Sequence, residues 1–248
     1  KFEEERLYKE IDYFSEKKID LVFGADSNFG ILKRDIKLAE KLAENKKKFG
    51  YPNRFTVCYT KNSTEKVFDL AKIFAEVGMH RGVSVSMQSL NTNTLKNIKR
   101  DNIKLDFFKS LQRKYVEADM VTYTELILPL PGETYESWKE GIDKLLDSSQ
   151  HSGLIVYNAN VMPNAELGDK NYQEKYKIKT AKIPLFQAHS DMPVDDIPEY
   201  EPIIVGTDSM STSQWKKAYK FTVFLQACHY LGLLQAITII LRHEYGGT

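Results

Sequence analysis

The feature that most constrains the fold is a repeated alternation of strand-like and helix-like segments over residues 1–163. Short apolar runs such as LVFGAD, RFTVCYT, GVSVSMQS, MVTYTELIL and GLIVYNANVM are separated by segments in which apolar residues recur at helical spacing. Alternation of this kind is typical of parallel βαβ units. The sequence therefore predicts an α/β fold, either an open doubly wound sheet or a barrel.

The strand-like runs carry polar residues on one of their two faces. The polar positions are Gly24, Asp26, Ser84, Ser86, Gln88, Tyr123, Glu125, Asn158 and Asn160. A sheet covered by helices on both faces reads as almost continuously apolar. Because burying an unpaired polar group costs about 1–3 kcal/mol, we expect these side chains to line a wet or ligand-filled lumen.

Charge and cysteine content exclude several classes of protein. Lys and Arg number 35 against 34 for Asp and Glu, and the net charge of +1 gives no electrostatic case for nucleic-acid binding. The two cysteines, Cys58 and Cys228, are far apart, which favours a reducing cytoplasm, and Cys58 is interpreted as a small core residue. The apolar run LGLLQAITIIL is too short to span a bilayer, so no membrane partner is expected.

Four positions are candidates for binding polar groups. Asp26 and Asn28, where a strand gives way to a loop, could hold an amine, or could simply form a turn. Gln88 offers both a donor and an acceptor to hydroxyls. Arg100 follows a short helix, and its planar guanidinium suits a carboxylate, although a surface cation at a helix end is equally consistent.

Glu125 is an acid between apolar residues of a strand that ends in Pro-Leu-Pro-Gly-Glu-Thr. It is well placed to accept hydrogen bonds from a diol such as a ribose. A buried salt bridge is the structural alternative. The turn after the strand favours a tight passage into a helix, with Thr134 as its N-cap.

Taken in order, the segments ADSNFG, VSMQSLNTNTLKNIKR, ELILPLPGETYESW and ANVMPNAEL resemble the radical S-adenosylmethionine (SAM) enzymes, in particular those often fused to a cobalamin-binding domain. The resemblance covers residues 1–163. It implies a partial (β/α)6 barrel, similar to a TIM barrel, that lacks its first strand in this chain. Residues 164–248 are expected to form an irregular segment followed by a mainly helical C-terminal extension.

The resemblance also implies residues that contact SAM. Asp26 and Asn28 match the strand end that holds the methionine amine of SAM, and Arg100 matches the cation that faces its carboxylate.

On the nucleoside side, Gln88 and Glu125 match inward residues that hold the ribose hydroxyls, with Ser86 beside them. Backbone around Val161 and Met162 matches the edge where adenine packs.

The implied cofactors are SAM, a [4Fe–4S] cluster, and cobalamin through an upstream domain. The cluster requires a CxxxCxxC loop that this sequence does not contain, so we expect its ligands upstream of Lys1, an expectation that fits a chain opening without an initiator methionine. A further departure is Pro129, where the family usually has glycine. The implied partners are a small-molecule substrate and an electron donor such as flavodoxin or ferredoxin.

The predicted function is reductive cleavage of SAM to a 5′-deoxyadenosyl radical, with cobalamin-dependent methyl transfer as one form of it. This chain alone is predicted to be inactive. One alternative is a non-catalytic barrel that binds a nucleotide-like ligand or a partner protein. Another is a barrel hydrolase with Asp26 and Glu125 as paired carboxylates.

Overall fold

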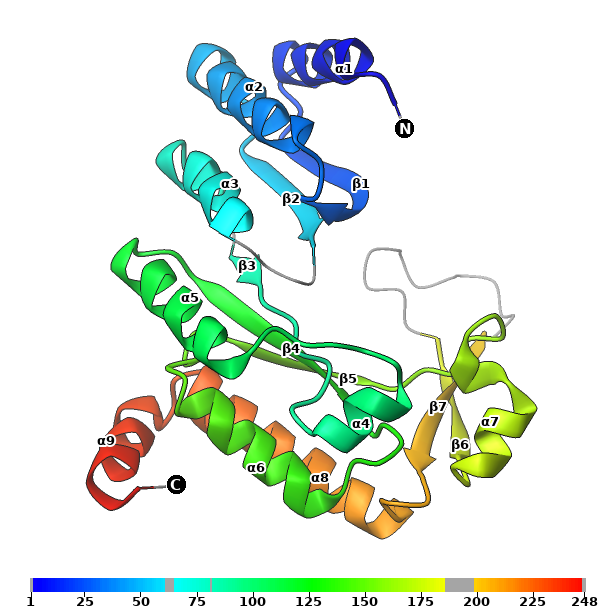
Figure 1. The fold of residues 1–248 in the computed structure, drawn as a ribbon. Helices are drawn as coiled ribbons and strands as arrows, with labels where there is room; N and C mark the ends of the chain where they lie inside the picture. The colour runs from blue at the N-terminus through cyan, green and yellow to red at the C-terminus, as the bar shows by residue number, and fades with distance from the viewer. Residues whose placement is uncertain (1, 61–64, 81, 186–198, 247–248) are drawn as a thin grey trace. The chain divides into compact units, whose positions relative to one another are not determined.

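The computed structural model (Figure 1) describes residues 2–60, 65–80, 82–185 and 199–246. The chain divides into two compact units. Unit 1 comprises residues 1–87, 103–124 and 148–153, and unit 2 comprises residues 88–102, 125–147 and 154–248. Each unit is thus assembled from separate stretches of sequence. The predicted division at residue 163 is a different partition and stays a prediction.

Unit 1 is an α/β assembly with parallel strand pairing. Its elements are α1 (Glu4–Glu16), β1 (Leu21–Phe29), α2 (Arg34–Phe49), β2 (Arg54–Tyr59), α3 (Glu65–Glu76), β3 (Val83–Ser84), α5 (Leu105–Glu117) and the start of β4 (Thr122–Leu128).

Strands β1 and β2 pair in parallel, with a bulge near the end of β1. The pairing runs in register up to Gly24 opposite Val57, and it resumes at Phe29 opposite Tyr59. Residues 25–28 therefore loop out of the ladder within the strand. The sequence predicted the strand and placed its end at this point, where the ladder is interrupted.

The core of unit 1 lies between this strand pair and its helices. The buried cluster consists of Ile11, Phe29, Leu38, Ala39, Leu42, Val57, Leu70, Phe74 and Met79. Cys58 is exposed, so its interpretation as a core residue was wrong. Because side chains alternate along a strand, the burial of Val57 against the helices sends Cys58 to the other face.

Unit 2 combines parallel and antiparallel pairing. Its elements are α4 (Thr92–Asn97), the rest of β4, α6 (Tyr135–Leu146), β5 (Leu154–Asn158), the 3₁₀ turn η1 (Glu166–Gly168), α7 (Lys170–Lys175), β6 (Lys179–Pro184), β7 (Tyr200–Gly206), α8 (Thr212–Leu225), the π-helical turn η2 (Gln226–Tyr230) and α9 (Gln235–Tyr245).

The β4–α6 passage forms as the turn residues predicted. Thr134 caps α6, because its hydroxyl accepts from the Ser137 amide at 3.0 Å while its own amide donates to the Ser137 hydroxyl at 2.9 Å. Trp138, buried on α6, donates its indole N–H to the Thr222 hydroxyl of α8 at 3.1 Å. Helices α6 and α8 therefore pack against each other within unit 2 (Figure 1).

The α/β class is confirmed, whereas a partial (β/α)6 barrel is not. Among the described residues the strands form separate sheets of two, three and two strands, in the orders β1-β2, β3-β4-β5 and β6-β7. The last sheet is antiparallel, and β7 also bonds the chain just beyond β5, where the Ile204 amide donates to the Ala159 carbonyl at 2.8 Å. The contact that follows β5 is therefore antiparallel, whereas a barrel of parallel strands would continue with a parallel one.

The segment predicted to be irregular, residues 164–205, contains η1, α7, β6 and β7, with residues 186–198 outside the described part. The C-terminal helices form as predicted. No single helix in the described ranges is long and apolar enough to cross a membrane. The stretch Thr212–Tyr230 together with Gln235–Tyr245 meets that test on length and composition, but the pair is bent by 102°.

Candidate cofactor-binding site

Strand β4 presents Glu125 on its more accessible face. Along the strand Thr122, Thr124 and Leu126 are buried, while Tyr123 and Glu125 between them are only partly buried. The Tyr157 hydroxyl of β5 donates a hydrogen bond to Glu125 Oε1 at 3.1 Å. Glu125 thus faces away from the buried layer, and the Tyr157 hydroxyl is one hydrogen-bond partner of its carboxylate.

Tyr157 is a residue that the sequence analysis missed. Because it reaches Glu125 from the neighbouring strand, the two side chains share a face of the sheet. Strand alternation then puts Asn158 on the opposite face, so its predicted place beside Glu125 was wrong. Which β5 side chains lie beside Glu125 depends on how β4 and β5 pair. The sequence of either strand alone does not specify that pairing.

Gln88 is held next to Glu125 by the backbone. Its amide donates to the Glu125 carbonyl at 3.3 Å, and its carbonyl accepts from the Ile127 amide at 2.9 Å. Gln88 has a φ of +59°, a left-handed conformation that few residues other than glycine adopt without cost. Such conformations concentrate at functional sites, where surrounding contacts over-determine them. The structure therefore brings together Gln88 and Glu125, the two predicted ribose-binding residues.

A buried carboxyl, Glu133, lies at the turn after β4. It is 1% exposed, and it accepts hydrogen bonds from the hydroxyls of Ser89 and Ser137. Burial raises the pKa of this carboxyl above its usual value, while hydrogen bonds from Ser137, Ser89 and Asn91 oppose the shift. From the sequence Glu133 was expected only to form part of a turn; the one signal available was an acid between a glycine and an N-cap residue.

The turn before Glu133 packs closely onto α4. Gly132 has a φ of +91°, and a Cβ placed on it would lie 2.6 Å from Asn97 Nδ2 and 3.0 Å from Asn93 Nδ2. Asn97 Nδ2 also donates to the Pro131 carbonyl at 3.2 Å, and the Gly132 amide donates to the Ser209 hydroxyl at 2.9 Å. Glycine at 132 is what allows α4 to approach the turn.

Three other predicted residues also belong to unit 2. Arg100 is exposed just beyond α4, and within the described ranges no hydrogen bond or ion pair is found for its guanidinium. The Val161 amide donates to the Pro202 carbonyl at 2.9 Å, and the Met162 carbonyl accepts from the Ala165 amide at 3.1 Å. Both of these backbone groups are therefore already bonded.

The remaining predicted residues belong to unit 1. Asp26 and Asn28 lie in the bulge of β1, where Asp26 Oδ1 accepts from the Asn28 amide at 2.9 Å, so the two form a local turn. Asp26 also borders a largely apolar cavity of about 310 Å³ between α1, β1 and α2. The Ser86 hydroxyl lies 2.7 Å from that of Ser84. Their contacts with SAM stay predictions.

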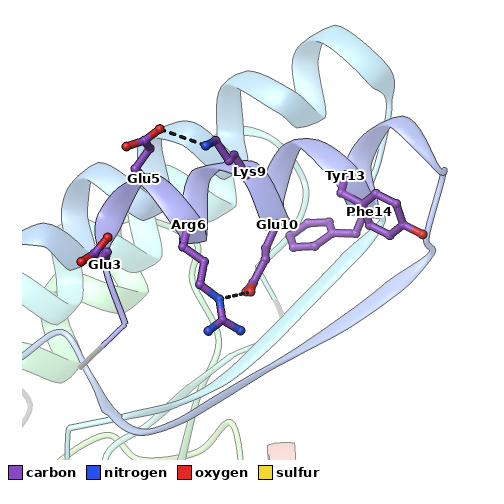
Figure 2. A pocket seen from close by; sticks show the side chains of 7 residues that line it. All are labelled: Glu3, Glu5, Arg6, Lys9, Glu10, Tyr13 and Phe14. Atoms are coloured by element: carbon purple, nitrogen blue, oxygen red, sulfur yellow. Dashed lines mark hydrogen bonds and ion pairs between the residues drawn. The ribbon is translucent and has the colours of Figure 1, made fainter.

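The surface hollow along α1 is a different kind of feature. Ion pairs join Lys9 to Glu5 at 3.0 Å and Arg6 to Glu10 at 2.8 Å along it (Figure 2). None of the predicted site residues lines it. Charged side chains that pair along one exposed helix face are typical of a solvated surface.

The cysteines of this chain do not fit a [4Fe–4S] cluster. A cluster of this type needs several thiolates, and the sequence contains only two cysteines. Cys58 is exposed on β2, and Cys228 is partly buried in η2. Among the described residues there is also no group of three or more His, Cys, Asp and Glu side chains that could hold a metal ion.

Comparison with known proteins shows what this chain is similar to. No family model matches it. It is 35% identical over 246 residues to the cobalamin-dependent radical SAM methyltransferase TokK of Streptomyces tokunonensis, a match that covers 99% of this chain and 36% of TokK. It is 33% identical over 249 residues to the 2-(S-pantetheinyl)-carbapenam-3-carboxylate methyltransferase of Streptantibioticus cattleyicolor, covering 100% of this chain and 36% of that enzyme. The chain thus spans about a third of the length of these relatives.

Two solved structures share the fold. Both are of TsrM, a radical SAM methyltransferase from Kitasatospora setae, one with cobalamin and a [4Fe–4S] cluster and the other with tryptophan and a SAM analogue. The TM-scores are 0.50 and 0.52 at 18% identity, covering 64% and 75% of this chain and 32% and 35% of TsrM, respectively. Over almost its whole length the chain is therefore similar to one segment of a cobalamin-dependent radical SAM methyltransferase, and it shares its fold with solved structures of another radical SAM methyltransferase.

Proposed function

We propose that this chain is the SAM-binding part of a cobalamin-dependent radical SAM methyltransferase, in which other parts of a longer protein hold the [4Fe–4S] cluster and the cobalamin. The observation that carries the proposal is 35% identity over 246 residues to an enzyme of that kind, of which the chain covers 36%. A SAM-binding segment that is separate from the cluster-binding segment is consistent with a chain that has only two cysteines and a polar face on strand β4.

The chemistry of the side chains supports a role for this face in ribose binding. An ionised Glu125 can accept strong hydrogen bonds from the two ribose hydroxyls. The Tyr157 hydroxyl, at 3.1 Å from Glu125 Oε1, restrains the orientation of the carboxylate. Gln88 can both donate to and accept from a hydroxyl, and its backbone is bonded to that of Glu125. A diol is the ligand that this combination suits.

The other predicted residues of unit 2 would hold the rest of SAM. Arg100 is exposed and could bind the methionine carboxylate through two parallel hydrogen bonds. The segment at Val161 and Met162, in the same unit as Arg100, offers an apolar edge to adenine.

When bound beside a reduced cluster, SAM supplies a 5′-deoxyadenosyl radical, and cobalamin supplies a carrier for the methyl group. The residues of this chain bind and orient SAM. A flavodoxin or ferredoxin is the class of partner that we propose as the electron donor.

The test uses the full-length protein that contains this chain, reconstituted anaerobically with iron, sulfide and cobalamin. Its first substrate probe is 2-(S-pantetheinyl)-carbapenam-3-carboxylate, the substrate in the name of one relative. We expect 5′-deoxyadenosine or S-adenosylhomocysteine to form, and Glu125→Gln to weaken SAM binding about tenfold or more. A reconstituted protein that forms neither product, and whose SAM affinity is unchanged in Glu125→Gln, would overturn the proposal.

A second arm uses this chain alone. After treatment with iron and sulfide it is expected to show no cluster absorbance, since its two cysteines cannot supply the ligands. Recovery of a complete cluster by this chain would contradict the division between cluster-binding and SAM-binding segments.

A further inference from the structure

We propose that Glu133 is a positioning residue that acts through Ser89 to hold the Gln88 side chain against the ribose of SAM. The inference rests on the proposed function and assigns a role to a side chain outside the predicted site. It is carried by hydrogen bonds among described residues of unit 2.

Glu133 joins two segments that are far apart in the sequence. One carboxylate oxygen, Oε2, accepts from the hydroxyl of Ser89, in the segment after β3, and the other, Oε1, accepts from the hydroxyl of Ser137 on α6. Glu133 and Ser89 are each 1% exposed. Water therefore has little access to compete for this contact, and a buried hydrogen bond to a carboxylate is a strong one.

Ser89 is fixed at several atoms, and it directly follows Gln88. Besides its bond to Glu133, its hydroxyl accepts from the Asn91 amide at 3.1 Å, and its carbonyl accepts from Asn102 Nδ2 at 2.7 Å. On the other side, the backbone of Gln88 is bonded to Glu125 and Ile127. Hydrogen bonds therefore hold both the backbone of Gln88 and the residue that follows it, which accounts for a left-handed φ of +59° at a residue other than glycine.

The capping of α6 does not require Glu133. The reciprocal hydrogen bonds between Thr134 and Ser137 already complete the capping box of that helix. Burying a carboxyl carries a desolvation cost that an apolar side chain would avoid. What the carboxyl adds is the connection to Ser89, and through it control over the direction of the Gln88 side chain.

The experiment measures ribose recognition, which a purely structural role would leave unchanged. Binding of S-adenosylhomocysteine and of its 2′-deoxyribose analogue is measured by calorimetry on the full-length protein. We expect wild type to bind S-adenosylhomocysteine about tenfold more tightly than the 2′-deoxyribose analogue, because the analogue lacks one hydroxyl and so loses one hydrogen bond at a polar site. Ser89→Ala and Glu133→Ala are expected to reduce that preference to about twofold.

Glu133→Gln serves as the conservative rescue. Each serine hydroxyl can turn to donate or accept, so a glutamine can still bond both, and the ribose preference should remain. Ser137→Ala is the matched control. It removes the other hydroxyl bonded to Glu133 and should lower thermal stability while leaving the preference intact.

The outcomes separate this inference from the proposed function. If Gln88→Ala and Glu125→Gln lose the preference while folded Ser89→Ala keeps it, the positioning role of Glu133 is overturned and the proposed site stands. If Gln88→Ala and Glu125→Gln keep it as well, the proposed ribose site fails and the inference fails with it. If Glu133→Ala does not fold, the near-isosteric Ser89→Ala decides.

Discussion

The Tyr157 hydroxyl donates to Glu125 Oε1 at 3.1 Å across neighbouring strands. This contact accounts for an acid within a strand whose alternate residues are buried. The phenol donates a hydrogen bond to one carboxylate oxygen, and the proposed ribose site uses the remaining acceptor capacity of the same group.

Tyr157→Phe tests this contact. The variant loses one hydrogen bond to Glu125 and keeps the ring, so we expect SAM affinity to fall about three- to tenfold. The fold should be unaffected, because Tyr157 is 49% exposed. Calorimetric titration of the full-length protein with SAM measures the change. Tyr245→Phe removes a hydroxyl from a tyrosine that is 81% exposed on α9 and is the matched control; equal effects of the two substitutions would refute the role of Tyr157.

Gly132→Ala tests the close approach between the β4–α6 turn and α4. A Cβ at 132 would lie 2.6 Å from Asn97 Nδ2, and Asn97 could retreat only by giving up its bond to the Pro131 carbonyl. Together with the positive φ this should lower the free energy of unfolding by about 2–3 kcal/mol.

Gly50→Ala is the comparison for this substitution. Gly50 also has a positive φ, +78°, but its Cβ would meet nothing within 4 Å, so its cost should be about 1 kcal/mol. Urea denaturation of both variants isolates the steric part. If the two substitutions cost the same, the approach of α4 to the turn does not require glycine at 132.

The sequence predicted what depends on local periodicity and local turn chemistry. The alternating burial over residues 83–89 and along β4 follows from the period of a strand. Thr134 caps α6, as its residue type and position indicate. These features need only neighbouring residues, which is why they could be read in advance.

What the sequence did not predict depends on contacts between distant segments. The pairing of Tyr157 with Glu125 requires the register of two strands, and the exposure of Cys58 depends on which face of β2 the helices cover. The link from Glu133 to Ser89 spans 44 positions. Loop closure over such distances is set by the whole fold, so no local pattern marks these partners.

Arg242→Ala tests what holds α9 against the end of α6 within unit 2. Arg242 bonds Asp143 at 3.0 Å and Asp147 at 2.7 Å, and its side chain is only 12% exposed. Loss of the guanidinium should lower the free energy of unfolding by about 1 kcal/mol. It should also speed hydrogen exchange of the backbone amides in Gln235–Tyr245. Because salt screens ion pairs, the difference in stability between variant and wild type should be smaller in 1 M salt.

Arg6→Ala is the matched control for Arg242. Arg6 pairs with Glu10 four residues further along α1 (Figure 2), and both side chains are exposed, so removal of Arg6 should lower the free energy of unfolding by about 0.3–0.5 kcal/mol. Unchanged exchange in α9 of the Arg242→Ala variant would show that apolar packing alone holds that helix.

The pH dependence of stability tests the buried state of Glu133. Burial raises the pKa of its carboxyl above the usual 4.5, although hydrogen bonds from Ser137, Ser89 and Asn91 oppose this. In the window between the two pKa values the folded chain therefore keeps a proton that the unfolded chain has lost. The stability that the protonated form provides is fully present below pH 4.5 and is lost as the pH rises through the raised folded pKa.

Glu133→Gln should remove this loss of stability with rising pH, because the glutamine amide stays neutral at every pH tested. We expect the variant and wild type to have similar free energies of unfolding at about pH 4, and the variant to be the more stable of the two at pH 7. Urea denaturation at several pH values measures the difference, with Glu140→Gln, an exposed position of the same helix region, as the control for losing a carboxylate. A variant that became less stable relative to wild type as the pH rose would show that the carboxylate is favoured in the fold, because its hydrogen bonds would then outweigh the cost of burial.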